Sequence, residues 1–204
     1  MNAEGPVAEK FPENYPEAVR FMFSHAGPGL LLAILISALA ARPMLGGISW
    51  RDAVIVLLFV GLRGFMEWGL HRYVFNAAPL PLLGVRLHNP ISVMHGTHHA
   101  NPRQAEALFF GWKGVLLVLF LSLLTLLLLF RDVGLAVSGL LAVVVNLLLY
   151  EWFHLVAHSS IAPSFPPFRA AVHNHRRHHF VDGDHSFGVT SILADRVLGT
   201  YRHS

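Results

Sequence analysis

Four long apolar stretches constrain this chain more than any other feature of its sequence. They run over residues 21–41, 50–67, 109–130 and 133–156. A helix needs about 20 apolar residues to cross the hydrocarbon core of a bilayer, so the sequence predicts four transmembrane helices. The second stretch is the shortest, and Arg63 and Glu67 interrupt it. We therefore expect the end of that helix to leave the lipid and to continue into a polar region.

The composition favours a membrane protein over a soluble one. Apolar residues make up 54% of the chain and charged residues only 13%, against about 25% charged residues in an ordinary globular domain. The chain contains no cysteine, which excludes a disulfide scaffold, a cysteine-based zinc finger and an iron–sulfur cluster. Residues 1–20 are polar and lack the basic start of a signal peptide. We expect a polar N-terminal segment over 1–20 and a single membrane domain over 21–204.

Short links pair the four helices into two antiparallel hairpins. Residues 42–47 contain a proline and two glycines, and residues 131–134 form a tight turn. Arg42, Arg51 and Arg131 are the cations at this end, whereas the other twelve of the 15 lysines and arginines lie toward the opposite end. Because cation-rich loops stay on the cytoplasmic side, both termini and both long polar segments are predicted to be cytoplasmic. Attraction to an anionic leaflet explains the positive charge without a nucleic-acid partner.

The chain contains 14 histidines, and twelve of them lie between His71 and His185. Spacings of three and four residues place side chains on one helix face, so the segments 95–99, 154–158 and 175–179 each offer imidazoles that converge. Neutral imidazole is a ligand for iron, zinc, copper and nickel. Nine such histidines are too many for one four-coordinate ion but fit two metal ions. The candidate ligands are His71, His95, His98, His99, His154, His158, His175, His178 and His179.

Other polar residues lie close to these segments. Glu67 and Glu151 precede the nearest candidate ligands by four and three residues. We expect their carboxylates to orient imidazoles from behind, or else to pair with an arginine. Three more histidines are His88, His173 and His185. Each could be an additional ligand, could hydrogen-bond to a ligand, or could lie on the surface. The sequence thus predicts an all-α integral-membrane protein whose four helices carry a cytoplasmic, histidine-rich helical cap with a two-metal site.

The histidine segments also carry a family resemblance. They read HRYVF at 71–75, HGTHH followed by ANP at 95–102, the pair His154 and His158, and HRRHH at 175–179. Together with the tail FGVTSILADRVLGT at 187–200, they resemble the fatty acid hydroxylase superfamily of integral-membrane hydroxylases and desaturases. The resemblance covers about residues 67–200. The long gap between the first two histidine segments is more similar to the fatty acid 2-hydroxylase branch than to the sterol branch.

The resemblance implies a four-helix membrane base under a cytoplasmic cap, with the nine candidate histidines as ligands of two iron ions. Zinc can take the place of iron in purified protein. The implied reaction is hydroxylation of an unactivated C–H bond of a membrane lipid, with O2 and with electrons from a separate cytochrome b5-like or ferredoxin-type donor. Asn76 stands where the family commonly has another histidine. We expect it to lie behind the ligands, with either His88 or His185 as a replacement ligand or an open position on one metal ion.

Other functions remain open at this point. A sterol or carotenoid hydroxylase and a desaturase of the same superfamily share the first hydrogen abstraction. A metal transporter or metal-binding membrane protein is the alternative from another class. The ligands of a transporter should lie in the middle of the membrane, whereas the candidate ligands here lie at predicted helix ends and beyond. The sequence therefore favours the lipid hydroxylase.

Overall fold

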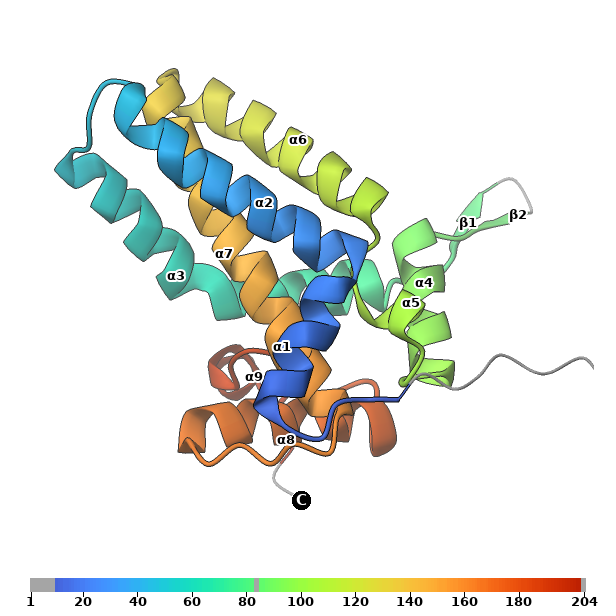
Figure 1. The fold of residues 1–204 in the computed structure, drawn as a ribbon. Helices are drawn as coiled ribbons and strands as arrows, with labels where there is room; N and C mark the ends of the chain where they lie inside the picture. The colour runs from blue at the N-terminus through green and yellow to red at the C-terminus, as the bar shows by residue number, and fades with distance from the viewer. Residues whose placement is uncertain (1–9, 83–84, 203–204) are drawn as a thin grey trace, which may run out of the picture.

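The computed structural model describes residues 10–82 and 85–202 and is mostly helical (Figure 1). Four of its helices are long and apolar enough to cross a membrane. They are α2 (Ala26–Ala41), α3 (Trp50–Leu70), α6 (Trp112–Phe130) and α7 (Val133–His158). The predicted all-α membrane fold with four spanning helices in two hairpins is confirmed. Which side of the membrane the cap faces stays a prediction.

The second spanning helix is longer than its apolar stretch. Helix α3 begins at a capping box, in which Ser49 and Asp52 satisfy each other's backbone amides. It continues past Arg63 and Glu67 without a break and runs directly into a π-helical turn, η2 (His71–Phe75). Local π-helical turns are common at functional sites. The helix therefore continues past the polar residues as expected, and the turn that follows it carries His71. Where it leaves the lipid stays a prediction.

The N-terminal helix α1 (Tyr15–Ser24) crosses the expected boundary at residue 20. Asn14 caps it by accepting a hydrogen bond from the amide of Glu17 at 3.0 Å. The chain then breaks at His25, whose extended backbone (ψ 141°) ends α1 and starts α2. Helix α1 packs on α7 through the stacked rings of Tyr15 and Trp152, 6.1 Å apart. The first nine residues of the predicted polar segment lie outside the described residues, so the division at residue 20 stays a prediction.

Helix α7 is the centre of the bundle, with α2, α3 and α6 packed around it (Figure 1). Small residues let its neighbours approach closely, as in other membrane bundles. A Cβ at Gly139, for example, would lie 2.8 Å from the side chain of Leu126 on α6. Since α7 also ends in His154 and His158, the same helix forms the core of the bundle and carries two candidate ligands.

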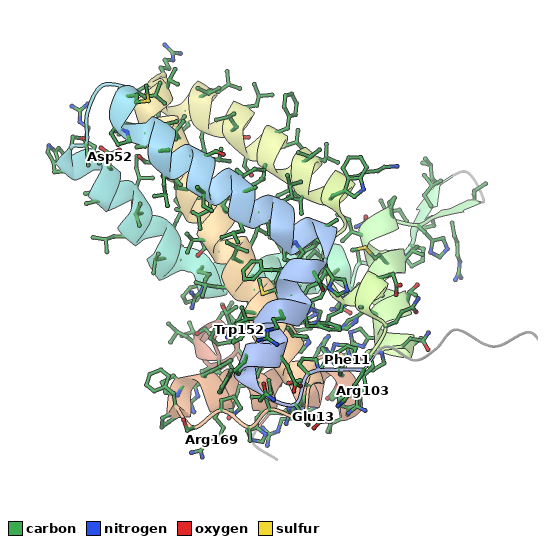
Figure 2. All side chains as sticks on the ribbon, viewed as in Figure 1. Phe11, Glu13, Asp52, Arg103, Trp152 and Arg169 are labelled. Carbon is green, nitrogen blue, oxygen red and sulfur yellow. The ribbon has the colours of Figure 1, made fainter. Side chains whose placement is uncertain are left out.

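A buried ion pair joins three helices at the end of the bundle that lies away from the histidines. Asp52 on α3 accepts hydrogen bonds from Nε of Arg42 at 2.8 Å and from Oγ of Ser138 at 2.5 Å. Figure 2 shows Asp52 at one end of the bundle and Trp152 and Arg169 at the other. Arg42 follows α2 directly in a short 3-10 helix, η1 (Arg42–Met44), and Ser138 belongs to α7. The pair therefore fixes the loop end of the bundle.

The cap is built from short helices at the other end. These are α4 (Pro90–Ala100), α5 (Ala105–Leu108), α8 (Pro166–Phe180) and α9 (Leu193–Val197). Helix α8 lies across the end of the bundle, and a small antiparallel hairpin projects from the side of the cap (Figure 1). The hairpin pairs β1 (Leu80–Leu82) with β2 (Val85–Leu87), with Leu80 opposite Leu87.

Substitution of one partner of the buried ion pair tests its role. Asp52→Ala leaves the guanidinium of Arg42 buried without its anion, and we expect a loss of about 3 kcal/mol of stability. Arg51→Ala removes an exposed neighbouring charge and should change stability little. Thermal unfolding of both variants in detergent measures the difference. Equal unfolding temperatures for the two variants would show that the ion pair does not hold the bundle together.

Candidate metal centre

Four elements bring the nine candidate histidines to one place. The turn η2 supplies His71, α4 supplies three residues, the end of α7 supplies two and α8 supplies three. Spacings of three and four residues aim the side chains of each element in one direction. Seven of the nine residues are buried, and His99 and His179 are partly buried. The structure thus collects histidines that are up to 108 positions apart, from 71 to 179, in one interior site.

The nine imidazoles form two groups, and within each group the candidate ligand atoms lie within 4.8 Å of one another. The first group contains His98, His154, His158, His175 and His179, and the second contains His71, His95, His99 and His178. The groups adjoin each other, because the rings of His99 and His179 stack at 4.0 Å. Two adjacent sets of nitrogen ligands are the arrangement that a dinuclear centre requires.

The spacing of the nitrogens fits metal coordination. In the first group, Nε2 of His98 lies 2.9 Å from Nε2 of His154 and 3.1 Å from Nε2 of His158. In the second group, Nε2 of His95 lies 3.1 Å from that of His71 and 3.0 Å from that of His99. Nitrogens bound about 2.1 Å from one ion at right angles are about 3.0 Å apart. Each group therefore has the dimensions of a coordination sphere.

Backbone carbonyls orient three of the rings from behind. Nδ1 of His71 donates to the carbonyl of Phe187 at 2.5 Å, Nδ1 of His154 to that of Leu108 at 3.1 Å, and Nδ1 of His178 to that of His185 at 2.9 Å. A neutral imidazole that donates from Nδ1 has its lone pair on Nε2. These lone pairs point into the groups, where a cation is the partner that stabilises them. Nε2 of His178 is buried without a hydrogen-bond partner among the described residues.

Comparison with known proteins places the chain in a family. The model of the fatty acid hydroxylase family matches residues 53–200. The chain belongs to the fatty acid hydroxylase family. The resemblance stated from the histidine segments is confirmed, and with it the assignment to a family of hydroxylases, which are oxidoreductases. The candidate ligands of this fatty acid hydroxylase all lie within the matched residues.

Curated relatives and a solved structure agree with this assignment. Dihydroceramide fatty acyl 2-hydroxylase FAH2 of Arabidopsis thaliana is 29% identical over 173 residues, covering 85% of this chain and 71% of the relative. FAH1 of the same plant is 25% identical over 211 residues, covering 96% and 82%. The solved structure of full-length Scs7p, in which only the hydroxylase domain is visible, has a TM-score of 0.67 at 23% identity. This chain spans 65% of that chain's length and 86% of its own, and the likeness concerns the fold.

Within residues 10–82 and 85–202, the hydrogen bonds of the two glutamates go to loop backbone and to Thr190 rather than to histidines. Glu67 accepts hydrogen bonds from the amides of Val189 and Thr190 and from the hydroxyl of Thr190. Glu151 accepts one from the amide of Phe110 at 2.8 Å. Buried loop amides need acceptors, and carbonyls already take the ring N–H groups. The glutamates therefore fix the backbone of loops near the site, and do not orient the imidazoles directly as expected.

A second buried carboxylate network was not foreseen from the sequence. Asp195 on α9 accepts hydrogen bonds from the amides of Phe187 and Gly188 at 2.9 and 2.8 Å and from Nδ2 of Asn174 on α8 at 2.8 Å. These contacts hold the carbonyl of Phe187 against His71. Asp195 lies in the family-like tail at 187–200, and Asn174 directly precedes the histidine segment at 175–179. Their contact joins positions 21 apart, which local spacing does not predict.

The remaining predicted residues lie around the two groups. His88 and His173 are exposed and belong to neither group. His185 places Nδ1 2.9 Å from Oδ2 of Asp182, and its carbonyl accepts from His178. Asn76 donates from Nδ2 to the carbonyl of His71 at 3.0 Å and so caps the turn η2. Direct ligation by His88 or His185 in place of the missing family histidine therefore has no support in this geometry.

Burial keeps the cap imidazoles neutral. Burial, together with the charges of neighbouring histidines, lowers the pKa of His95 to about 2, that of His98 to about 3 and that of His99 to about 4. Burial also lowers the pKa values of the three histidines on α8, His175, His178 and His179. Because only the unprotonated ring binds a metal ion, the cap is ready for coordination at neutral pH.

These pKa shifts predict an acid-sensitive metal-free protein. The pKa of a histidine in an unfolded chain is about 6.5. Below that pH, the histidines of the unfolded chain are protonated, whereas those of the folded cap stay neutral. Stability then falls as the pH drops through about 6.5 toward the folded values of about 4 and 3 for His99 and His98. We expect a lower unfolding temperature at pH 5.5 than at pH 7.5 in chelator-treated protein. An unfolding temperature that stays constant or rises on acidification would contradict this account.

Proposed function

We propose that this chain is a membrane-bound di-iron hydroxylase that oxidises a fatty acyl chain of a membrane lipid. The observation that carries the proposal is the pair of adjacent all-histidine groups at the end of a four-helix membrane bundle. The nine candidate histidines would hold the two irons. When bound, the iron pair supplies the activation of O2 that attack on an unactivated C–H bond requires. Overall, R–H, O2, two electrons and two protons give R–OH and water.

An apolar cavity that opens at the surface of the bundle supports a lipid substrate. It has a volume of about 440 Å³ and lies between α3, α6 and α7, where Met66, Leu70, Val118, Leu121 and Leu147 contribute to its lining. Ligand cavities typically measure about 300–1,000 Å³. Arg63 and Asn146 also line it, as expected for polar side chains at membrane depth, which face the interior of a bundle. A substrate that stays in the bilayer would reach the site through this cavity.

The residues of this chain have three tasks in the proposed reaction. The histidines stay neutral and hold the metals, the backbone carbonyls fix the rings, and burial of the cluster keeps water away from it. The relatives in Arabidopsis thaliana are named as 2-hydroxylases of the fatty acyl chain of dihydroceramide. We therefore place the oxidised position at the acyl carbon next to the carbonyl group, on a chain linked to a lipid headgroup.

We also propose how the site is oriented and supplied with electrons. The distribution of lysine and arginine favours a cap on the cytoplasmic side. A separate cytochrome b5-like or ferredoxin-type protein would deliver the two electrons that the reaction consumes. A metal transporter is less consistent with the geometry, since the candidate ligands lie at helix ends and in the cap rather than at mid-membrane.

Turnover with labelled oxygen tests this function. Iron-loaded protein in vesicles that contain saturated acyl lipids, with a reduced donor and 18O2, should form a 2-hydroxyacyl product that carries one 18O atom by mass spectrometry. His98→Ala should reduce the product at least a hundredfold because it removes a ring that faces two other imidazoles. His173→Ala, on an exposed histidine of the same cap, should retain activity. Iron-loaded protein that incorporates 18O into no lipid would refute the proposal.

A further inference from the structure

Three aromatic rings stand between the intramembrane cavity and the histidines. They are Phe75 on η2, Phe110 just before α6, and Tyr150 on α7. Their ring centroids are 6.1 Å apart for Phe75 and Phe110, 6.4 Å for Phe75 and Tyr150, and 5.6 Å for Phe110 and Tyr150. The three rings thus contact one another in a closed set, which we call the aromatic collar.

Cavities adjoin the collar on both sides. All three rings line the intramembrane cavity of about 440 Å³ and also a slot of about 20 Å³. The slot is lined further by His95, His98 and His154. A space of this size holds little more than one water molecule. The space between the three rings and these candidate ligands therefore has room for about one methylene group.

The collar is fixed by the elements that carry the candidate ligands. The ring of Phe75 lies 5.5 Å from that of His95, and the ring of Tyr150 lies 5.4 Å from that of His154. The amide of Phe110 donates to Glu151 at 2.8 Å. On its other side, a Cβ at Gly27 would lie 1.8 Å from the carbonyl oxygen of Phe110. Helix α2 and Glu151 thus hold Phe110 in place, and the collar cannot widen without displacing the site.

A polar pocket continues the path beyond the collar. It has a volume of about 240 Å³ and shares Phe75 with the collar and His95 with the slot. Asn76, His88 and Ser92 contribute polar side chains to it. Phe75 lines all three spaces: the apolar cavity, the narrow slot and the polar pocket. These spaces match a molecule with a long apolar tail, one reacting carbon and a polar headgroup.

We propose that the aromatic collar selects an unbranched acyl chain and sets which carbon meets the histidines. The inference rests on the proposed function and adds its substrate geometry. The tail lies in the intramembrane cavity, the carbon next to the carbonyl group lies in the slot, and the amide or ester headgroup lies in the pocket with Asn76 and His88. A fused-ring sterol or a methyl branch near the reacting carbon is too wide for the collar.

Enlarging the collar tests the selection. We expect Phe110→Ala to raise turnover of a 3-methyl-branched acyl lipid at least tenfold relative to the linear lipid, and to spread hydroxylation of the linear chain over neighbouring carbons. Tyr150→Phe keeps the ring and should keep the selectivity. Phe120→Ala removes an exposed ring on α6 that does not line the cavity and serves as the matched control. An unchanged branched-to-linear ratio and unchanged carbon position in Phe110→Ala would overturn the inference.

A binding measurement separates this inference from the proposed function. Metal-free protein in vesicles is irradiated with a fatty acid amide that carries a diazirine in the middle of its chain, and the labelled peptides are identified by mass spectrometry. We expect labels on Val143 and Leu147, two half-buried residues that line the cavity, even where no product forms. Labels confined to lipid-facing residues such as Phe120 would overturn the inference, whereas cavity labels without 18O product would refute the function alone.

Discussion

The structure depends on nine imidazoles that face one another, seven of them buried and two partly buried. Each neutral ring has one N–H group and one lone pair, and burial makes either one costly without a partner. The carbonyls of Phe187, Leu108 and His185 accept N–H groups from behind, which leaves lone pairs directed inward at separations of about 3 Å. A metal cation can satisfy several inward lone pairs together. The cap therefore has the arrangement that could hold metal ions, and the loops that carry these three carbonyls fix the rings in it.

The membrane bundle and the tail of the chain both serve this arrangement. Helix α7 is the core of the bundle and ends in two of the imidazoles, so the packing of the bundle sets their position. The tail after α8 would be a loose loop without its buried anchors. Glu67 holds it from the membrane side and Asp195 from within the cap, and between them they place Phe187 on His71. The bundle also provides the apolar cavity, so the oxidising site and the lipid phase meet at the end of α7.

The sequence predicted what depends on local spacing, and missed what depends on distant contacts. The four spans follow from apolar length, and the grouping of histidines follows from helical spacing. The start of α1 at Tyr15 depends on the Asn14 cap and on packing against Trp152. The length of an apolar stretch does not reveal either contact. The hydrogen-bond partners of Glu67 lie 122 and 123 positions away. Its closeness in sequence to His71 therefore suggested the wrong partner. The collar brings together rings from η2, from α7 and from the loop before α6. No spacing in the sequence predicts these contacts.

The most direct test of the account is a crystal structure of the iron-loaded protein with anomalous data at the iron edge. We expect two anomalous peaks per chain. One should lie among His98, His154, His158, His175 and His179, and the other among His71, His95, His99 and His178. A single peak, or peaks outside these groups, would contradict a dinuclear site held by the nine histidines and with it the basis of the proposed hydroxylase.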